Sequence, residues 1–244
     1  MPHDHRDVLV VCLPTYNERE NLEAMVSTLG ERLPDGSRIL VIDDNSPDGT
    51  GEIAERLATE RADVDVLHRP RKEGLGPAYL AGFRRALELG ADLVLEMDCD
   101  FSHDPKDVPR LVAAAEDADL VLGSRYVEGG GTRNWGFLRR AISRGGSLYA
   151  QILLGLPIRD LTGGFKCYRR AVLEAIELDT IRSKGYAFQI ETTDRAIRAG
   201  FRVVEIPIVF VDREVGGSKM SRSIVLEAIW KVPALRLSRL RARA

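Results

Sequence analysis

The 244-residue sequence has few cysteines, few aromatic residues and no long run of apolar residues. Its three cysteines, Cys12, Cys99 and Cys167, lie far apart and lack the CxxC spacing of zinc or redox sites. We expect reduced thiols, with Cys12 and Cys99 packed as small core residues. No apolar run reaches the roughly 18–20 residues that a membrane-crossing helix needs, and no secretory signal pattern begins the chain. We therefore expect no spanning segment, which leaves open a protein that lies on a membrane.

Excess charge of one sign is also absent, because 35 Lys and Arg residues nearly balance 37 Asp and Glu residues. The net charge of -2 gives no overall signal for nucleic-acid binding. With 44% hydrophobic residues, the chain can bury a substantial core. The length fits one large domain, residues 1–220, followed by a C-terminal tail, residues 221–244.

Short runs rich in Val, Ile and Leu alternate with segments of helical spacing. The strand-like runs are Val8–Leu13, Arg38–Ile42, Asp63–Leu67, Asp92–Met97 and Leu120–Gly123. This alternation predicts an α/β fold with a mostly parallel sheet covered on both faces, and a ligand site beyond the carboxyl ends of the strands. The later segments read as a helix, a strand-like run, a helix and a strand: Leu138–Leu154, Gly163–Tyr168, Glu191–Ala199 and Val203–Val209.

Two carboxylates, Asp98 and Asp100, close the fourth apolar run. Residues two apart in a strand point the same way, so these side chains can converge on one point. They would repel unless a cation lies between them, and Mg²⁺ or Mn²⁺ takes oxygen ligands together with substrate phosphate. The alternative is a strand-to-loop turn in which an Asp caps the next segment.

Polar clusters also end the first two runs, at Pro14–Glu18 and Asp43–Thr50. Tyr16 offers a flat face for a nucleotide base, and the carboxylates of Glu18 and Asp44 can accept hydrogen bonds from base N–H groups or ribose hydroxyls. The competing interpretation makes Asn17 a helix N-cap and Asp48-Gly49 a turn.

Basic residues follow later strands. Arg213 and Lys219 flank Gly216-Gly217 in a loop that can close over a diphosphate. Arg125 follows the fifth run and could grip phosphate with two parallel hydrogen bonds. Taken singly, Arg213 and Lys219 could be solvated surface charges, but their placement beside glycines and after a strand favours a functional role.

The segments PTYNE, DDNSPDGT, RKEGLGPAYLAGF, MDCDFSHDP, GSRY, GGF and DREVGGSKM occur in this order over residues 8–220. In this combination the chain resembles the dolichyl-phosphate (polyprenyl-phosphate) mannosyltransferases among the inverting family-2 glycosyltransferases. The resemblance implies a GT-A fold in residues 1–220 and transfer of mannose from GDP-mannose to polyprenyl phosphate. It also implies Mg²⁺ or Mn²⁺ as cofactor. Because the tail of such an acceptor stays in lipid and no spanning segment is expected, we expect a peripheral location on the cytoplasmic face of the membrane, with a membrane-embedded partner protein as another way to reach the lipid.

The resemblance assigns roles residue by residue. Nucleotide contacts fall on Pro14, Tyr16, Glu18, Ile42 and Asp44; metal and diphosphate contacts on Asp98, Asp100 and the backbone of Cys99; further donor or acceptor contacts on Arg125, Arg213 and Lys219. Cys99 replaces a more usual Ala, and Gly163-Gly164-Phe165 replaces a Ser-Gly-Phe version. Ser102 stands where some relatives have a Gln metal ligand, so its hydroxyl or a water would complete the metal shell.

The acceptor class follows from elementary acid–base chemistry. A hydroxyl acceptor needs a general base, whereas a phosphate monoester, with a second pKa near ~6, is already largely dianionic at neutral pH. The segment Phe188–Glu191 lacks the adjacent Glu-Asp pair of many hydroxyl-glycosylating relatives, which favours a phosphate acceptor. Glu191 could instead cap the following helix.

The tail Ser221–Ala244 mixes apolar residues, Trp230 and late arginines, a composition typical of an interfacial helix, with Pro233 as an expected kink. The apolar stretch Ala150–Leu156 could add a second membrane contact. The alternative is that the start of the tail packs on the α/β core.

Two further functions stay open. One is a transferase that uses a UDP-sugar, such as UDP-glucose, with a lipid phosphate or hydroxyl acceptor. The other is a non-catalytic nucleotide-sugar-binding subunit, which the full set of charged residues disfavours. A dinucleotide-dependent oxidoreductase is disfavoured because no GxGxxG follows the first strand.

Overall fold

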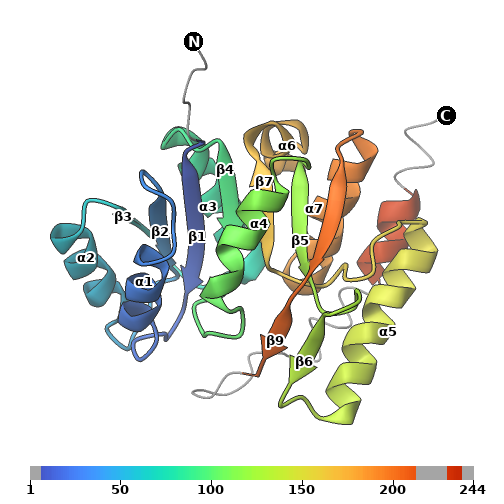
Figure 1. Ribbon diagram of the computed structural model, residues 1–244, viewed down its shortest axis with the longest axis horizontal. Coiled ribbons are helices and arrows are strands. Elements are labelled where there is room, and N and C mark those ends of the chain that lie inside the picture. Colours follow the sequence, from blue (N-terminus) through green and yellow to red (C-terminus); the bar gives the residue numbers. More distant parts are fainter. Residues whose placement is uncertain (1–6, 213–229, 238–244) are drawn as a thin grey trace.

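The computed structural model describes residues 7–212 and 230–237. Its strands and helices alternate along most of the chain (Figure 1). In chain order they are β1 Leu9–Thr15, α1 Leu22–Gly30, β2 Arg38–Asp43, α2 Thr50–Glu60, β3 Val64–His68, α3 Leu75–Glu88, β4 Leu93–Glu96, η1 Pro105–Asp107, α4 Val108–Ala114, β5 Leu120–Ser124, β6 Gly131–Arg133, α5 Phe137–Leu154, β7 Lys166–Arg169, α6 Arg170–Ala175, η2 Leu178–Thr180, α7 Gly185–Arg198, β8 Val203–Pro207 and β9 Val209–Val211.

The main sheet has seven strands in the order β3-β2-β1-β4-β7-β5-β8. All neighbouring pairs are parallel except the two that β7 makes with β4 and β5. The predicted α/β fold with a mostly parallel sheet is therefore confirmed. A second sheet pairs β6 with β9 and lies beyond the carboxyl ends of the main strands, beside the start of α5 (Figure 1).

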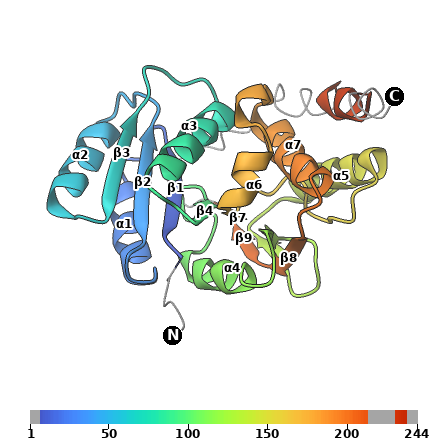
Figure 2. The ribbon, with the colours of Figure 1, turned by 90° about the horizontal axis from the view of Figure 1, so that it is seen from above.

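Strand β1 shows why the sheet is covered on both faces. Its side chains alternate between two cores: Val10 and Cys12 pack with α3 and α7, whereas Val11 and Leu13 pack with α1 and α4. Viewed from above, α3, α6 and α7 lie on one side of the sheet and α1 and α4 on the other (Figure 2). Because both faces are buried, β1 is apolar along its length instead of alternating with polar residues.

Two local predictions were wrong. Asn17 does not cap α1, which begins at Leu22; it turns the chain with a positive φ of 56°, and its N–H donates to the Ser46 hydroxyl at 3.2 Å. Helix α7 begins at Gly185, not at Glu191. Residues 187–194 are all buried, so this helix lacks the one-sided pattern by which a surface helix is recognised. The predicted turn at Asp48-Gly49 is confirmed, with Gly49 at a φ of 92°.

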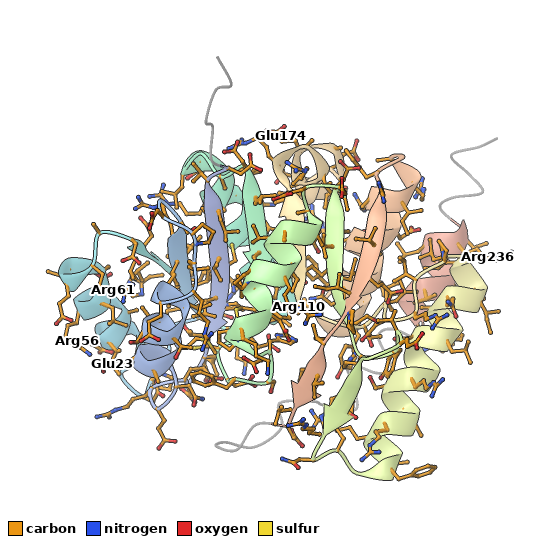
Figure 3. The ribbon with its side chains drawn as sticks, viewed as in Figure 1. Glu23, Arg56, Arg61, Arg110, Glu174 and Arg236 are labelled. Carbon is orange, nitrogen blue, oxygen red and sulfur yellow. The ribbon has the colours of Figure 1, made fainter. Side chains whose placement is uncertain are left out.

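Residues 230–237 are helical, include Pro233, and lie against α5. Val232 is buried in the core, and Arg236 donates a hydrogen bond to the Leu153 carbonyl at the end of α5 (Figure 3). This part of the tail therefore packs on the domain, while Trp230 is 77% exposed. Residues 221–229 and 238–244 lie outside the described residues.

The stretch Ala150–Leu156, predicted to add a second membrane contact, is mostly buried but keeps one exposed apolar side chain. Ala150, Leu154 and Leu156 are at most 5% exposed and belong to the core, whereas Ile152 is 70% exposed. Within residues 7–212 and 230–237, none of the helices combines the length and hydrophobicity that crossing a bilayer requires.

Candidate functional site

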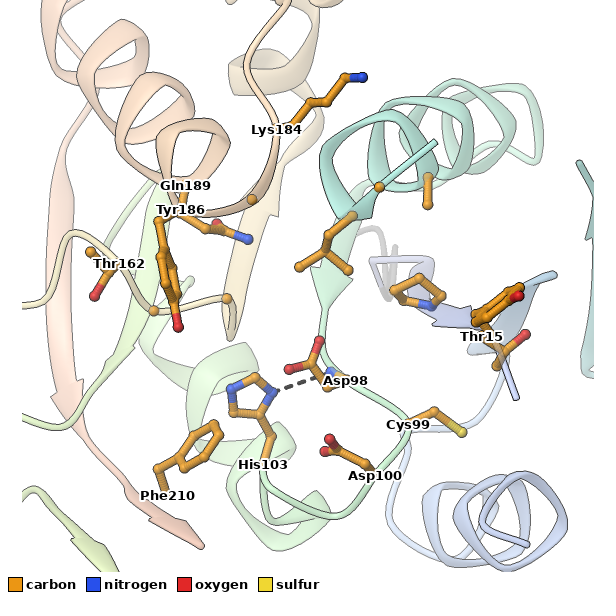
Figure 4. Close-up of a pocket in the computed structure, with 18 of the residues that line it drawn as sticks. Thr15, Asp98, Cys99, Asp100, His103, Thr162, Lys184, Tyr186, Gln189 and Phe210 are labelled. Carbon is orange, nitrogen blue, oxygen red and sulfur yellow. Dashed lines mark hydrogen bonds between the residues drawn. The ribbon is translucent and has the colours of Figure 1, made fainter. Parts of the chain in front are cut away.

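A cavity of about 530 Å³ opens at the carboxyl ends of the main strands (Figure 4). Its walls come from the loops after β1, β2, β3, β4 and β5, from the starts of α3, α5 and α7, from the segment before β7, and from β9. Of the residues predicted to form the site, those that line it are Pro14, Tyr16, Glu18, Asp44, Asp98, Cys99, Asp100 and Arg125. The sheet topology thus brings together side chains that are more than 100 positions apart in the sequence.

The paired carboxylates lie on the loop that follows β4, and both reach the cavity (Figure 4). The loop is held tightly. The N–H of Ser102 donates to Asp100 Oδ1 at 3.0 Å, and Phe101 turns the chain with a φ of 59°. The N–H of Asp98 donates to Nδ1 of His103 at 3.2 Å.

His103 holds this loop in place through its buried ring. Its ring is 3% exposed and stacks on Phe165, with 4.9 Å between ring centroids. Burial lowers the pKa of His103 to about 4, so the imidazole is neutral and its Nδ1 can accept the Asp98 N–H. Sequence reasoning did not single out His103, although it lies within the MDCDFSHDP segment.

Asp98 and Asp100 fit a hard divalent cation. No group of three or more His, Cys, Asp or Glu side chains within the described ranges has the arrangement of a metal site. Mg²⁺ is commonly held by one or two carboxylates, with water and substrate phosphate completing its shell, so two carboxylates at an open cavity suit it. Ser102 does not line the cavity, and its carbonyl accepts the N–H of Val211. Its proposed role as a ligand through its hydroxyl stays a prediction.

The loops after β1, β2 and β3 present polar and aromatic groups for a nucleotide. The ammonium of Lys72 lies over the Tyr16 ring, 3.9 Å from its centroid, so the flat face predicted for a base is covered by a cation in this structure. Asp44 is paired with Arg69; burial raises the pKa of Asp44, and the charge of Arg69 opposes that rise. Ile42 is fully buried beneath Gly82 and does not line the cavity, so its predicted nucleotide contact has no side-chain basis here.

Arg125 lines the cavity, and its guanidinium is already paired with Asp160. Its Nε and Nη2 donate to the two oxygens of Asp160 at 2.7 and 2.6 Å, and its backbone N–H adds a third bond at 2.9 Å. The two guanidinium N–H groups that were expected to bind phosphate thus bind the carboxylate of Asp160, which is 0% exposed. Burial would raise the pKa of Asp160, but the charge of Arg125 and its hydrogen bonds hold that pKa below the ordinary value.

The predicted cations Arg213 and Lys219 lie outside the described residues. Other basic side chains line the cavity, namely Lys72, Arg139 and Lys184. Arg139, from the first turn of α5, pairs with Asp212 at 2.6 Å and lies 4.3 Å from the centroid of Trp135. The wall made by β5, α5 and α7 is therefore basic and aromatic.

Gln189 of α7 is the most unusual polar group of this wall. It is 2% exposed and lines the cavity, yet neither its amide nitrogen nor its amide oxygen has a hydrogen-bond partner among the described residues. Behind it, Glu96 of β4 and Lys166 of β7 form a fully buried cross-strand pair. Burial raises the pKa of Glu96 to about 7, and the charge of Lys166 and the nearby Gln189 amide oppose that rise. The side chains of Glu96 and Gln189 make no hydrogen bond of ordinary geometry.

Comparison with known proteins agrees with this geometry. The profile described as glycosyl transferase family 2 matches residues 10–177. The chain belongs to glycosyl transferase family 2. It is 51% identical over 239 residues to an undecaprenyl-phosphate mannosyltransferase of Micrococcus luteus, covering 96% of this chain and 98% of the relative. It is also 51% identical over 225 residues to a polyprenol monophosphomannose synthase of Mycolicibacterium smegmatis, covering 91% and 84%.

Solved structures share the fold. Glucosyl-3-phosphoglycerate synthase from Mycobacterium tuberculosis, in complex with Mn²⁺, UDP and glucosyl-3-phosphoglycerate, is similar with a TM-score of 0.68 and 19% identity. The match covers 93% of this chain and 80% of that one. A complex of the same synthase with Mg²⁺ and UDP has a TM-score of 0.67. At this identity the likeness establishes the fold of this family-2 glycosyltransferase and nothing finer.

Glu191 has a structural place in this glycosyltransferase that differs from the helix cap considered from the sequence. It lies inside α7, is 5% exposed, and does not line the cavity. Its carboxylate accepts hydrogen bonds from the Ser183 hydroxyl and from Arg195 at 2.7 Å. It therefore neither caps the helix nor faces a ligand, and it ties the start of α7 to the segment before it.

Proposed function

We propose that this chain transfers mannose from GDP-mannose to the phosphate of a polyprenyl phosphate, with inversion, giving polyprenyl β-mannosyl phosphate. The observation that carries the proposal is the match at 51% identity, over 96% and 91% of the chain, to two proteins named for mannose transfer to a polyprenyl phosphate. The cavity supports it chemically, because the carboxylates of Asp98 and Asp100 line it together with basic side chains, namely Lys72, Arg125, Arg139 and Lys184.

The donor would lie along the wall formed after β1, β2 and β4. Glu18 and Asp44 can accept hydrogen bonds from base or ribose, and Tyr16 can stack on the base once Lys72 moves aside. Asp98 and Asp100 would hold Mg²⁺ or Mn²⁺, which when bound neutralises charge on the departing diphosphate. The side-chain amide of Asn21 donates a hydrogen bond to the Glu18 carboxylate at 2.8 Å and fixes its position.

The reaction needs little proton transfer. A phosphate oxygen of the acceptor forms a bond to the anomeric carbon as the bond from that carbon to the GDP oxygen breaks, and approach from the opposite face inverts the configuration. The acceptor phosphate is largely dianionic at neutral pH, so it needs no general base. The basic wall, with Arg139 and Lys184, would position the acceptor and supply rate through proximity.

A peripheral location on the cytoplasmic face of the membrane fits a lipid acceptor and a soluble nucleotide-sugar donor. The three cysteines are buried free thiols, which agrees with a reducing compartment. A membrane-embedded partner protein is a second route by which such an enzyme can reach the lipid. Arg213 and Lys219 remain candidates for contacts with the phosphates of donor and acceptor.

A donor-competition assay tests the proposal. Purified full-length protein receives GDP-mannose and UDP-glucose in parallel, with polyprenyl phosphate in detergent, and with Mg²⁺, Mn²⁺ or a chelator. We expect mannosyl transfer that stops in chelator and returns with metal, and a β-anomeric product by NMR. Asp100→Asn should abolish transfer, whereas Asp117→Asn, an exposed carboxylate away from the cavity, should not. Preference for UDP-glucose, or full turnover in excess chelator, would contradict the proposal.

A further inference from the structure

Helix α5 carries its apolar side chains on the outside. In the described part of the chain eight large apolar side chains are exposed, and six of them lie on this one helix. They are Phe137 (87%), Leu138 (72%), Ile142 (41%), Leu148 (51%), Tyr149 (37%) and Ile152 (70%). The other two, Trp230 and Leu237, belong to residues 230–237, which pack beside α5 (Figure 2).

The exposed residues form one stripe. Leu138, Ile142, Gly145, Tyr149 and Ile152 follow the spacing of four and three residues that places side chains on one face of a helix. Isolated exposed apolar residues are ordinary, but a continuous stripe on a single helix marks a surface that binds another protein, a ligand or a membrane.

The inward face of the same helix combines the buried Ala150 and Leu154 with four polar side chains. Arg139, Ser143, Ser147 and Gln151 are spaced four apart. Arg139 pairs with Asp212, Ser143 accepts from the Tyr126 hydroxyl at 2.7 Å, and Ser147 shares a hydrogen bond with Thr162 at 3.1 Å. Gln151 donates to the Ile158 carbonyl at 3.2 Å. A helix whose outward face met only water would carry polar residues on that face and keep its apolar stripe toward the core.

Charge identifies what covers the outward face. Helix α5 has no Asp or Glu, and its three charged residues are Arg139, Arg140 and Arg144. Arg140 and Arg144 are exposed. Apolar and aromatic side chains bordered by arginines suit a bilayer that carries anionic lipid headgroups. A flat partner protein of neutral surface would leave these arginines without complementary charge.

Helix α5 also forms part of the cavity wall, so its outward face lies close to the candidate site. Arg139 of its first turn and the preceding Trp135 line the cavity, and both present buried nitrogens, Nε and Nε1, that have no partner among the described residues. A lipid whose tail stays in a bilayer beneath α5 could therefore present its phosphate to this wall. On the basis of the proposed function, we propose that the outward face of α5, with Trp230 and Leu237, seats the enzyme on an anionic lipid bilayer.

Vesicle flotation with the full chain tests this docking. Vesicles of phosphatidylcholine alone are compared with vesicles in which about one-third is phosphatidylglycerol. We expect the wild-type protein to float with the anionic vesicles, less so in high salt. The double variant Leu138→Glu/Ile152→Glu should lose at least about tenfold in partition, since burying one large apolar side chain contributes roughly one to two powers of ten. The charge-matched control Thr59→Glu/Ala113→Glu, on exposed positions of α2 and α4, should stay close to wild type.

Three results would overturn the docking proposal: no flotation of the wild type, equal loss in the two double variants, or a dimer that Leu138→Glu/Ile152→Glu converts to a monomer. The last would assign the face to a second copy of the chain. Circular dichroism melts confirm that each variant folds.

An activity assay distinguishes the docking proposal from the proposed transfer reaction. The Leu138→Glu/Ile152→Glu variant should retain transfer to a water-soluble short-chain polyprenyl phosphate and lose transfer to a long-chain acceptor in vesicles. Equal loss with both acceptors would contradict docking through α5. Absence of mannosyl transfer by the wild type with either acceptor, while vesicle binding persists, would overturn the assigned reaction and leave the docking surface intact.

Discussion

Replacing Asp160 by asparagine removes one charge from the buried pair that fixes Arg125. The carboxylate is 0% exposed and receives three hydrogen bonds from Arg125, at 2.6, 2.7 and 2.9 Å. Asparagine cannot accept at both positions, and it leaves a buried guanidinium uncompensated. Breaking a buried ion pair in this way costs roughly 3–5 kcal/mol. For a chain of this size we expect the thermal midpoint to fall by about 6–20 °C.

The pH dependence gives a second, independent readout. The folded-state pKa of Asp160 lies below the ordinary value of 3.8, so its stabilising contribution is present above that value and is lost as the pH falls through the folded-state pKa. Asparagine does not titrate. The gap in unfolding free energy between wild type and Asp160→Asn should thus be constant near neutral pH and narrow below about pH 4.

Asp179→Asn is the matched control, because Asp179 also receives two hydrogen bonds from one arginine, Arg84, but is 89% exposed. Exposed ion pairs contribute about 0–1 kcal/mol, so this variant should melt close to wild type. Calorimetric and circular-dichroism melts from neutral pH to about pH 3 supply the measurement. Equal midpoints for the two variants, or a gap that does not change with pH, would refute the assignment of Arg125 as a residue held by its buried partner.

Three further perturbations follow from other parts of the structure. Gln189→Leu should lower kcat/KM by up to about tenfold, since one neutral hydrogen bond contributes roughly 0.5–1.5 kcal/mol, with little change in the melting temperature; a lower melting temperature at unchanged kcat/KM would contradict a ligand-facing role. Gly76→Ala should destabilise by about 1–3 kcal/mol in denaturant titration, because its Cβ would lie 2.7 Å from the backbone oxygen of Ser183, whereas Gly146→Ala, in open space on α5, should stabilise slightly; equal effects would argue against the tight α3–α7 contact. Cys12 and Cys167 should resist maleimide until the chain unfolds, because burial raises both pKa values, that of Cys167 to about 12; mass spectrometry that finds either one labelled in the native state would disprove their burial.

Much of the fold could be predicted because it rests on local patterns. Strands buried on both faces are continuously apolar, and the predicted runs from Val8–Leu13 to Leu120–Gly123 coincide with strands of the main sheet. The direction of β7 could not be predicted, since a four-residue strand such as Lys166–Arg169 has the same composition in either orientation. The first residues of helix α7 are missed by the helical spacing, because burial of residues 187–194 on all sides removes the periodic signal.

The candidate site divides in the same way. Asp98, Asp100, Glu18 and Asp44 were predictable because they directly follow strands whose carboxyl ends meet at one edge of a parallel sheet. Asp160 and Gln189, by contrast, reach the site through tertiary packing. Asp160 lies 35 positions after Arg125, in a segment without regular structure, and no spacing rule joins the two residues.

The division of charge within the cavity links the chemistry to the membrane surface. The carboxylates that would hold the donor and its cation come from the β1, β2 and β4 loops, and apart from Lys72 the basic side chains, including Arg125, Arg139 and Lys184, come from the other half of the chain. A nucleotide diphosphate with its metal fits the first half, and a second, uncoordinated phosphate fits the other. Helix α5 supplies part of that second wall and also bears the exposed apolar stripe. On the proposed function and the proposed docking through α5, the acceptor phosphate would therefore enter beside α5, and the soluble donor would enter beside the β1, β2 and β4 loops.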